Sequence, residues 1–163
     1  MSVTIVATGA EQVIAALEVF KLSKQRAILS NAARKALAPI VKTARSVLPA
    51  AGSGSSGLNS GNYKKSIGVK QVSVRKTGPN QIVLLVGPRP NKFKWTDSKG
   101  KVRDPYFYGI PVEYGHVTNG VKVPAIPAMR IAYEKHKNEA ITVFTAALWS
   151  KISLELQKRA RVH

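Results

Sequence analysis

The chain has 163 residues, of which 44% are hydrophobic and 21% charged, and this is the size and composition of one globular domain. Lys and Arg number 26 against 8 Asp and Glu, so the formal net charge is +18, and Cys is absent. The lack of Cys excludes disulfide scaffolds, thiol catalysis and Cys-ligated zinc or iron–sulfur sites. With three His and no apolar run near the roughly 18 residues of a membrane span, we expect a single domain over residues 1–163 with no metal and no membrane segment.

The first third of the sequence predicts one short strand and two helices. Val3–Val6 favours a β-strand. Apolar residues at three- and four-residue spacing predict a helix over 10–22 and a second over 23–47. Pro39 lies inside the second pattern and predicts a kink or a break near Ala38. The first helix is expected to bury four apolar residues, namely Val13, Ile14, Leu17 and Phe20.

The middle of the sequence predicts a hairpin between two flexible loops. Residues 50–60 are rich in Gly and Ser and predict the first loop. Tyr63–Val74 alternates in polarity and Gln81–Val86 is an apolar run, with turn residues between them at 77–80. We expect an antiparallel hairpin whose second strand is buried on both faces. Residues 89–104 form the second, basic loop, which contains the pattern of a small extruded β-hairpin.

The last third predicts one long helix. Gly109 and Pro111 argue against a long regular helix over 106–115, whereas no Gly or Pro occurs between Ala128 and Lys158. A helix of this length spans about 45 Å, more than a core of this size covers. We expect part of it to project or to pack on another subunit, the alternative being an exposed, frayed C-terminus. The fold class is α+β: an antiparallel sheet of about four strands packed by helices on one face, with a long C-terminal helix.

The positive charge is concentrated in one part of the chain. Residues 21–105 carry 18 bases and two acids, and residues 21–96 carry no carboxylate. A solvated surface normally mixes its signs, so this imbalance favours a polyanionic neighbour, either nucleic acid or an acidic protein surface. The alternative is a basic protein kept soluble by its charge. Six residues are candidates for facing DNA or a partner: Lys64, Lys65, Lys92, Lys94, Lys99 and Lys101.

The sequence contains no pattern typical of catalysis. Glu113 is the only acid in a region that could form a cleft, so the paired carboxylates of acid–base chemistry are missing. His136 lies on the apolar side of the last helix and is expected to be packed in the core, and His116 is expected on the surface. No phosphate-binding loop, helix–turn–helix or RNA-recognition motif is found. We expect neither an enzyme, nor a cofactor, nor sequence-specific DNA recognition.

Three segments occur in a suggestive order: Ser60–Ile67 (SGNYKKSI), Val112–Gly115 (VEYG) and Val123–Ala132 (VPAIPAMRIA). As an ordered set they resemble the neck and tail-completion proteins of long-tailed bacteriophages. The residues that carry the resemblance are Gly61, Ser66, Glu113, Tyr114, Gly115, Pro127 and Arg130. The sequence departs from the family pattern at Ser60, Tyr63, His116, Ala128 and Ile131.

These motif residues also have local physical interpretations. The Ser66 hydroxyl is suited to a hydrogen bond with an adjacent turn. Glu113 is a lone acid among bases and is expected to pair with one, Arg130 being the candidate. Gly115 permits a tight turn, and Pro127 preorganises the start of the last helix. The motifs therefore hold the fold, form an interface, or do both.

The resemblance implies a structural protein of the virion, at the head–tail joint or the top of the tail, assembled in the cytoplasm of the bacterial host. It implies a ring of identical subunits, sixfold to match a tail tube, beside other phage neck and tail proteins. Double-stranded DNA would pass through the lumen without sequence readout, which agrees with the positive charge. The alternative function is a non-specific nucleic-acid-binding protein of another kind.

Overall fold

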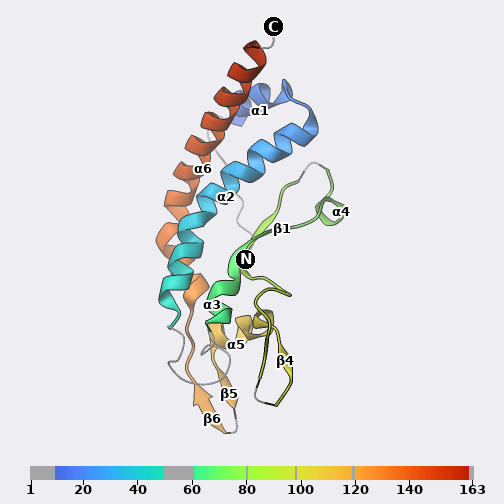
Figure 1. Cartoon of the computed structure of the whole chain (residues 1–163). Coiled ribbons are helices and arrows are strands. Elements are labelled where there is room, and N and C mark those ends of the chain that lie inside the picture. The colour runs from blue at the N-terminus through green and yellow to red at the C-terminus, as the bar shows by residue number, and fades with distance from the viewer. Residues whose placement is uncertain (1–9, 50–60, 80, 98, 119, 162–163) are drawn as a thin grey trace.

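The computed structural model describes residues 10–49, 61–79, 81–97, 99–118 and 120–161. The expected strand at Val3–Val6 and the expected flexible loop at 50–60 lie outside these residues. Helices dominate the structure, together with small antiparallel sheets (Figure 1). The helices are α1 (Ala10–Glu18), α2 (Leu22–Val47), α3 (Asn62–Ser66), α4 (Val74–Thr77), the 3-10 helix η1 (Pro105–Tyr108), α5 (Gly109–Tyr114) and α6 (Ala128–Ala160). The strands are β1 (Ile67–Gln71), β2 (Leu84–Pro88), β3 (Trp95–Thr96), β4 (Val102–Arg103), β5 (His116–Thr118) and β6 (Val121–Val123).

Two long helices, α2 and α6, run antiparallel and form the spine of the molecule (Figure 1). They enclose two separate groups of buried residues. The upper cluster lies where α1 and the first half of α2 meet the second half of α6, and it contains Leu17, Ile28, Ala32, Ala147, Leu148 and Ile152. The lower cluster lies where the second half of α2 meets the start of α6 and the middle of the chain, and it contains Ile40, Ala44, Leu48, Tyr63, Ile67, Val112, Ala128 and Ala132.

The long C-terminal helix is confirmed. α6 has 33 residues, which corresponds to about 50 Å at 1.5 Å per residue. Its buried residues fall into two groups, one at its start in the lower cluster and one in its second half in the upper cluster, where α2 packs against it. The stretch 157–161 is fully exposed and extends past α1 (Figure 1). The fold therefore covers more of this helix than the sequence predicts, and packing on another subunit stays a prediction.

The two N-terminal helices differ in detail from expectation. α2 is one continuous helix with Pro39 inside it, so the break near Ala38 is not seen. Burial of Ala36 and Ile40 on either side of the proline holds the helix in place despite the lost backbone hydrogen bond. α1 ends at Glu18 instead of residue 22, and Ile14 is 54% exposed although its spacing predicted burial.

The single sheet of about four strands is wrong for the residues that the structure describes. Their strands form three separate two-stranded antiparallel sheets, β1–β2, β3–β4 and β5–β6. The core is closed by helix packing between α2 and α6, with β1 and β2 lying against α2. The α+β class therefore holds, but the sheet has no central role.

The predicted hairpin is present with shifted strands. Asn62–Ser66 is helical, so only residues 67–71 of the expected strand Tyr63–Val74 are extended, and β1 pairs with β2 from Ile67↔Pro88 to Gln71↔Leu84. The second strand is not buried on both faces, because Val83 is 36% and Leu85 55% exposed. The alternation in the sequence cannot show that Tyr63 is drawn into the core as part of a helical turn.

Two further hairpins lie at the lower end of the molecule (Figure 1). β3 and β4 form the small hairpin that the sequence indicated within 89–104, with Trp95 opposite Arg103. The β5–β6 hairpin was not anticipated, although Asn119–Gly120 between two β-favouring runs is a strong hairpin signal. Residues 105–114 form a 3-10 turn and a six-residue helix, as the argument against a long helix predicted. Among the described residues, no helix is long and apolar enough to cross a membrane.

Candidate functional site

A basic groove of about 460 Å³ runs between α2 and the β1–β2 hairpin. Four cationic side chains line this surface, which we call the basic groove: Arg34, Lys42, Arg45 and Arg89. Small and apolar residues form the rest of the lining, namely Ala38, Val41, Gly68 and Val69. The groove is thus a positively charged surface with an apolar base.

The helical repeat places three of these cations on one side of α2. Arg34, Ala38 and Lys42 are four residues apart and Arg45 follows three later, so all four positions share one helix face. Ala38 has a side chain too small to fill the space between the two flanking cations. The spacing was visible in the sequence, but only the fold shows that Arg89 faces it from the end of β2.

Arg45 is held in place by backbone carbonyls. Its Nε and Nη2 donate to the Ile67 carbonyl at 3.1 and 2.6 Å, and Nη2 also reaches the Lys65 carbonyl at 3.4 Å. The carbonyls leave the full positive charge of the guanidinium uncompensated. Arg45 therefore joins α2 to the start of β1 while contributing charge to the groove.

Arg89 occupies the space that a side chain at Gly68 would fill. A Cβ at Gly68 would lie 3.0 Å from Arg89 Nε, and the Arg89 backbone N–H donates to the Ser66 carbonyl at 3.0 Å. Arg89 Nε is buried and has no hydrogen-bond partner among the described residues. A glycine in β1 thus lets a cation lie flat on the strand, where one of its donors is left unsatisfied.

No ion pair neutralises the groove within the part of the chain that the structure describes. The ion pairs there involve Lys24, Arg103, His136, Lys137 and Lys158, and none includes a groove cation. Like charges without counter-charges repel one another, and a polyanion that spans them relieves this repulsion. The chemistry of the groove suits phosphates or carboxylates in a row.

The lysines singled out from the sequence do not line this groove. Lys64 and Lys65 lie in α3, where Lys64 Nζ donates to the Leu48 carbonyl at 3.3 Å and Lys65 is exposed. The other four are exposed on and around the β3–β4 hairpin: Lys92, Lys94, Lys99 and Lys101. The four lysines of the β3–β4 region are therefore not part of the groove lining, whereas Lys65 adjoins the groove through the bond from Arg45 to its carbonyl.

The three motif segments, far apart in sequence, meet in one place. Tyr63 and Ile67 from the first, Val112 from the second, and Ala128 and Ala132 from the third all belong to the lower cluster. Tyr63 is 2% exposed, and burial together with the nearby charge of Glu113 raises its pKa to about 12. The motifs thus build one packed unit beside the start of α6.

The individual motif residues have clear structural roles. Gly61 adopts a left-handed conformation (φ 66°) just before α3, and the buried Ser66 hydroxyl donates to the Tyr63 carbonyl at 2.7 Å. Pro127 immediately precedes α6, and its carbonyl accepts from Ile131 N–H at 2.9 Å. These contacts agree with the local interpretations of Ser66 and Pro127.

Glu113 pairs with Arg130 through a different group than the sequence suggested. Its Oε2 and Oε1 accept from the backbone N–H groups of Met129 and Arg130, both at 3.0 Å. The carboxylate therefore caps the N-terminus of α6, where free N–H groups and the helix dipole favour an anion. The Arg130 guanidinium lies over the Tyr114 ring instead, 5.5 Å from its centroid.

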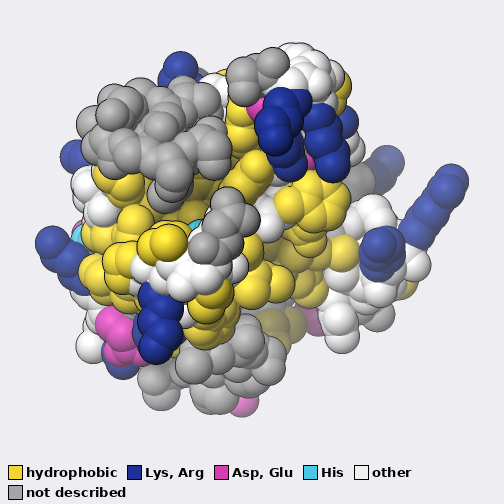
Figure 2. All heavy atoms as spheres, turned by 90° about the horizontal axis from the view of Figure 1, so that it is seen from below, with side chains coloured by type: hydrophobic (Ala, Val, Ile, Leu, Met, Phe, Trp, Pro, Cys, Tyr) yellow, Lys and Arg dark blue, Asp and Glu magenta, His cyan; other side chains and the backbone are white. Residues whose placement is uncertain are grey.

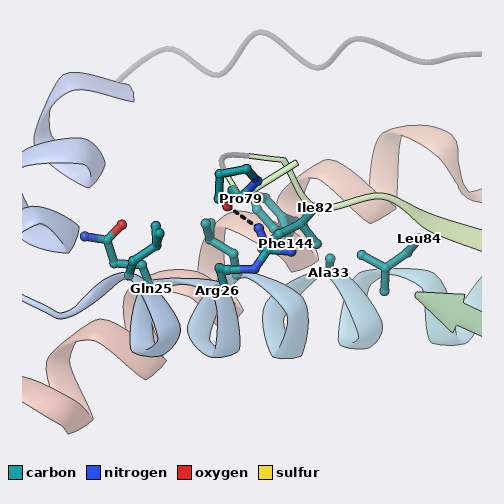
Figure 3. A pocket seen from close by; sticks show the side chains of 9 residues that line it. Gln25, Arg26, Ala33, Pro79, Ile82, Leu84 and Phe144 are labelled. Carbon is teal, nitrogen blue, oxygen red and sulfur yellow. Dashed lines mark hydrogen bonds between the residues drawn. The ribbon is translucent and has the colours of Figure 1, made fainter. Parts of the chain in front are cut away.

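A second groove, of about 480 Å³, lies between α2 and the residues Pro79, Ile82 and Leu84, and Phe144 of α6 also lines it (Figure 3). Arg26 is the one charged residue among the described residues that line it, and it donates to the Pro79 carbonyl (Figure 3). It also donates to the Gln81 carbonyl at 3.0 Å. This cation fastens the loop before β2 to α2. The described residues that line the groove offer no acid, base or nucleophile for chemistry.

The two histidines in the described part of the chain, His116 and His136, are surface or packing residues. His136 is 14% exposed and its ring nitrogens contact Thr43 Oγ1 at 2.7 Å and Glu139 Oε2 at 2.5 Å, so it links α2 and α6. His116 is exposed. In the described part of the chain, no group of three or more His, Asp or Glu side chains is arranged to hold a metal ion.

Comparisons of the sequence with protein-family models and with curated proteins, and of the structure with solved structures, found no match.

Proposed function

We propose that this chain is a structural neck or tail-completion protein of a long-tailed bacteriophage, without catalytic activity. The observation that carries the proposal is the convergence of the three motif segments in the lower cluster beside the capped start of α6. Motifs that resemble one family in order and also pack as one unit are better explained by common architecture than by chance.

The basic groove supports the role of DNA in this proposal. A ring of subunits around a DNA passage needs a positive wall that contacts phosphates and does not read bases. Arg34, Lys42 and Arg89 supply such a surface, and no carboxylate occurs in residues 21–96 to oppose it. In the proposed assembly the subunits form a ring, a hexamer if it matches the tail tube, with other neck and tail proteins above and below.

Imaging of intact virions tests this assignment. The phage that encodes the chain is purified and its head–tail joint is reconstructed at a resolution that distinguishes helices. We expect the antiparallel α2–α6 pair to be recognisable in a ring at the joint or at the top of the tail. Absence of the chain from purified virions would refute the proposal.

The second candidate function is a non-specific nucleic-acid-binding protein of another kind, which the basic groove also favours. Duplex binding as a function of salt separates a local groove from a diffuse positive charge. Lys42→Glu should weaken binding to all sequences alike and should reduce the slope of log affinity against log salt by about 0.9 for each phosphate that is no longer neutralised. Lys35→Glu changes the net charge equally from the neighbouring face of α2 and is the matched control.

Equal effects of the two substitutions would mean that the overall charge, and not the groove, binds DNA. A preference of about tenfold or more, roughly 1.4 kcal/mol, for one duplex over another of equal length would contradict both the passage and the non-specific alternative, and would favour sequence-dependent DNA binding. Tight binding by the free monomer together with absence from virions would favour the second candidate function.

A further inference from the structure

The lower end of the molecule exposes a group of large apolar side chains from η1, α5 and the β5–β6 hairpin. We call it the apolar end, and it consists of Phe107 (75% exposed), Ile110 (76%), Tyr114 (70%), Val117 (64%) and Val121 (66%). Figure 2 shows this end from below, with hydrophobic side chains across much of the face and Lys and Arg side chains around it. An apolar surface of this kind on a charged protein marks an interaction site.

The β5–β6 hairpin is exposed on both of its faces. Val117 lies opposite Lys122 and Thr118 opposite Val121, so the two valines point to opposite sides of the hairpin. Two-stranded hairpins are marginally stable in water unless something packs on them. A partner that contacts both sides would stabilise this one.

The acids at this end are already engaged by the chain itself. Glu113 accepts from two backbone N–H groups of α6. Asp104 accepts from the backbone N–H groups of Asn91 and Tyr106, and Asp97 pairs with Arg103 at 2.8 Å. Two exposed cations lie directly beside the apolar end: Lys122 is opposite Val117 in the β5–β6 hairpin, and Arg130 lies over the Tyr114 ring.

Arg130 is held in a defined orientation. Its guanidinium lies 5.5 Å from the centroid of the Tyr114 ring, a cation–π arrangement, and the side chain remains exposed. A guanidinium fixed in this way presents its donors in a fork that matches a carboxylate. Such a directional donor favours a protein side chain over a fluid layer of lipid headgroups.

We propose that the apolar end binds a different protein, through a partner surface that is apolar at its centre and carries Asp or Glu at its rim. A face-to-face contact with the same end of a second copy is disfavoured because it would bring like cations together, and crosslinking distinguishes a head-to-tail contact between copies from a different protein. This inference does not depend on the phage assignment, because it rests on the exposure and charge of the end alone.

Site-specific photo-crosslinking tests the proposal in the cells that make the full chain. Benzoylphenylalanine replaces Phe107, or Ile110 as a second position, and the same residue at Leu85 of β2 is the control. We expect one major crosslinked protein whose attached segment contains apolar residues with adjacent Asp or Glu. Arg130→Glu should reduce the yield by about tenfold, and replacing the partner's acid with Arg should restore it.

Three outcomes would overturn the proposal. The first is crosslinking mainly between copies of this chain, with loss of self-association in Tyr114→Ser on sedimentation. The second is absence of a protein crosslink combined with binding to vesicles that contain about 30% phosphatidylglycerol and loss of that binding in Tyr114→Ser. The third is an equal crosslinking yield for the wild-type chain and Arg130→Glu, which would show that charge complementarity does not contribute to binding.

Discussion

Gly115 links α5 to the β5–β6 hairpin and illustrates how much one residue of the motif constrains. Its backbone has a φ of +76°, and a Cβ there would lie 2.9 Å from the Val123 carbonyl oxygen and 3.0 Å from Ala125 N. Both the conformation and the space therefore require glycine. Only glycine fits after Tyr114, because residues 123–125 pass close to this position as the chain returns toward α6.

Gly115→Ala should lower the free energy of unfolding by about 2–4 kcal/mol, because it combines a left-handed conformation with a steric clash. Gly120→Ala is the matched control, since Gly120 has a φ of +78° with nothing near its Cβ position, and it should cost only about 1–2 kcal/mol. Urea denaturation of both variants measures the difference. Equal losses would show that the close approach of residues 123–125 does not matter.

Tyr63 gives the lower cluster a dependence on alkaline pH. Burial and the charge of Glu113 raise its pKa from 10.0 to about 12. The raised pKa means that the contribution of Tyr63 to stability is fully present below pH 10 and is lost as the pH rises toward 12. Unfolding free energy should fall by about 2 kcal/mol more over this range in the wild type than in Tyr63→Phe. Guanidinium denaturation between these pH values measures it, and identical pH profiles would contradict the assignment.

At the scale of the elements, the stability of α6 depends on which of its residues other elements bury, and not on the length of the helix. Ile152 is 1% exposed in the upper cluster, whereas residues 157–161 are all exposed. The ion pair of Lys24 with Glu155 at 2.8 Å joins this part of α6 to α2, and the Glu155 side chain is only 15% exposed. Contacts with other elements therefore hold the helix as far as Glu155, and the exposed last turn is expected to add little stability.

Ile152→Ala should destabilise the protein by about 2–4 kcal/mol because it empties a filled position in the upper cluster. Ending the chain after Leu156 should cost less than about 1 kcal/mol, with removal of the hydrogen bond from Arg159 to the Val19 carbonyl as the main change. Thermal unfolding of the two variants compares them. A larger loss of stability from the truncation would mean that the last turn has a structural role.

The two long helices could be predicted from the sequence, because their apolar spacing extends over many residues, whereas the short helices α3 and α4 were not predicted. α6 starts at Ala128 as expected, and α2 has nearly the expected bounds. The β1–β2 and β3–β4 hairpins were predicted but not their bounds, since alternation over 63–74 does not distinguish a strand from a turn of helix followed by a strand. The β5–β6 hairpin was missed although the Asn-Gly pair in the sequence signals it, because strands of three residues show little alternation.

At the scale of the whole molecule, the basic groove and the Glu113 cap depend on contacts between residues that are far apart in the sequence, and no local sequence pattern shows these contacts. The basic face of α2 is legible as a spacing of four and three residues, but Arg89 joins it only because β2 pairs with β1 and Gly68 leaves room. In the same way, the charges predicted an ion pair between Glu113 and the Arg130 guanidinium. In the structure, Glu113 accepts a hydrogen bond from the backbone N–H of Arg130 instead. The predicted ion pair between Glu113 and the Arg130 guanidinium is therefore not formed, and Glu113 reaches residue 130 through the backbone, where the charge of the side chain has no part.

The Glu113 contacts have a mechanical consequence. Three hydrogen bonds join the short helix α5 to the start of α6: the two to Glu113 and one from Ile126 N–H to the Val112 carbonyl at 2.7 Å. Val112, next to Glu113, is buried in the lower cluster with Ala128 and Ala132 of α6, so apolar packing reinforces these three bonds. A force applied to the apolar end is therefore passed through α5 to the first turn of α6 by hydrogen bonds and packing together.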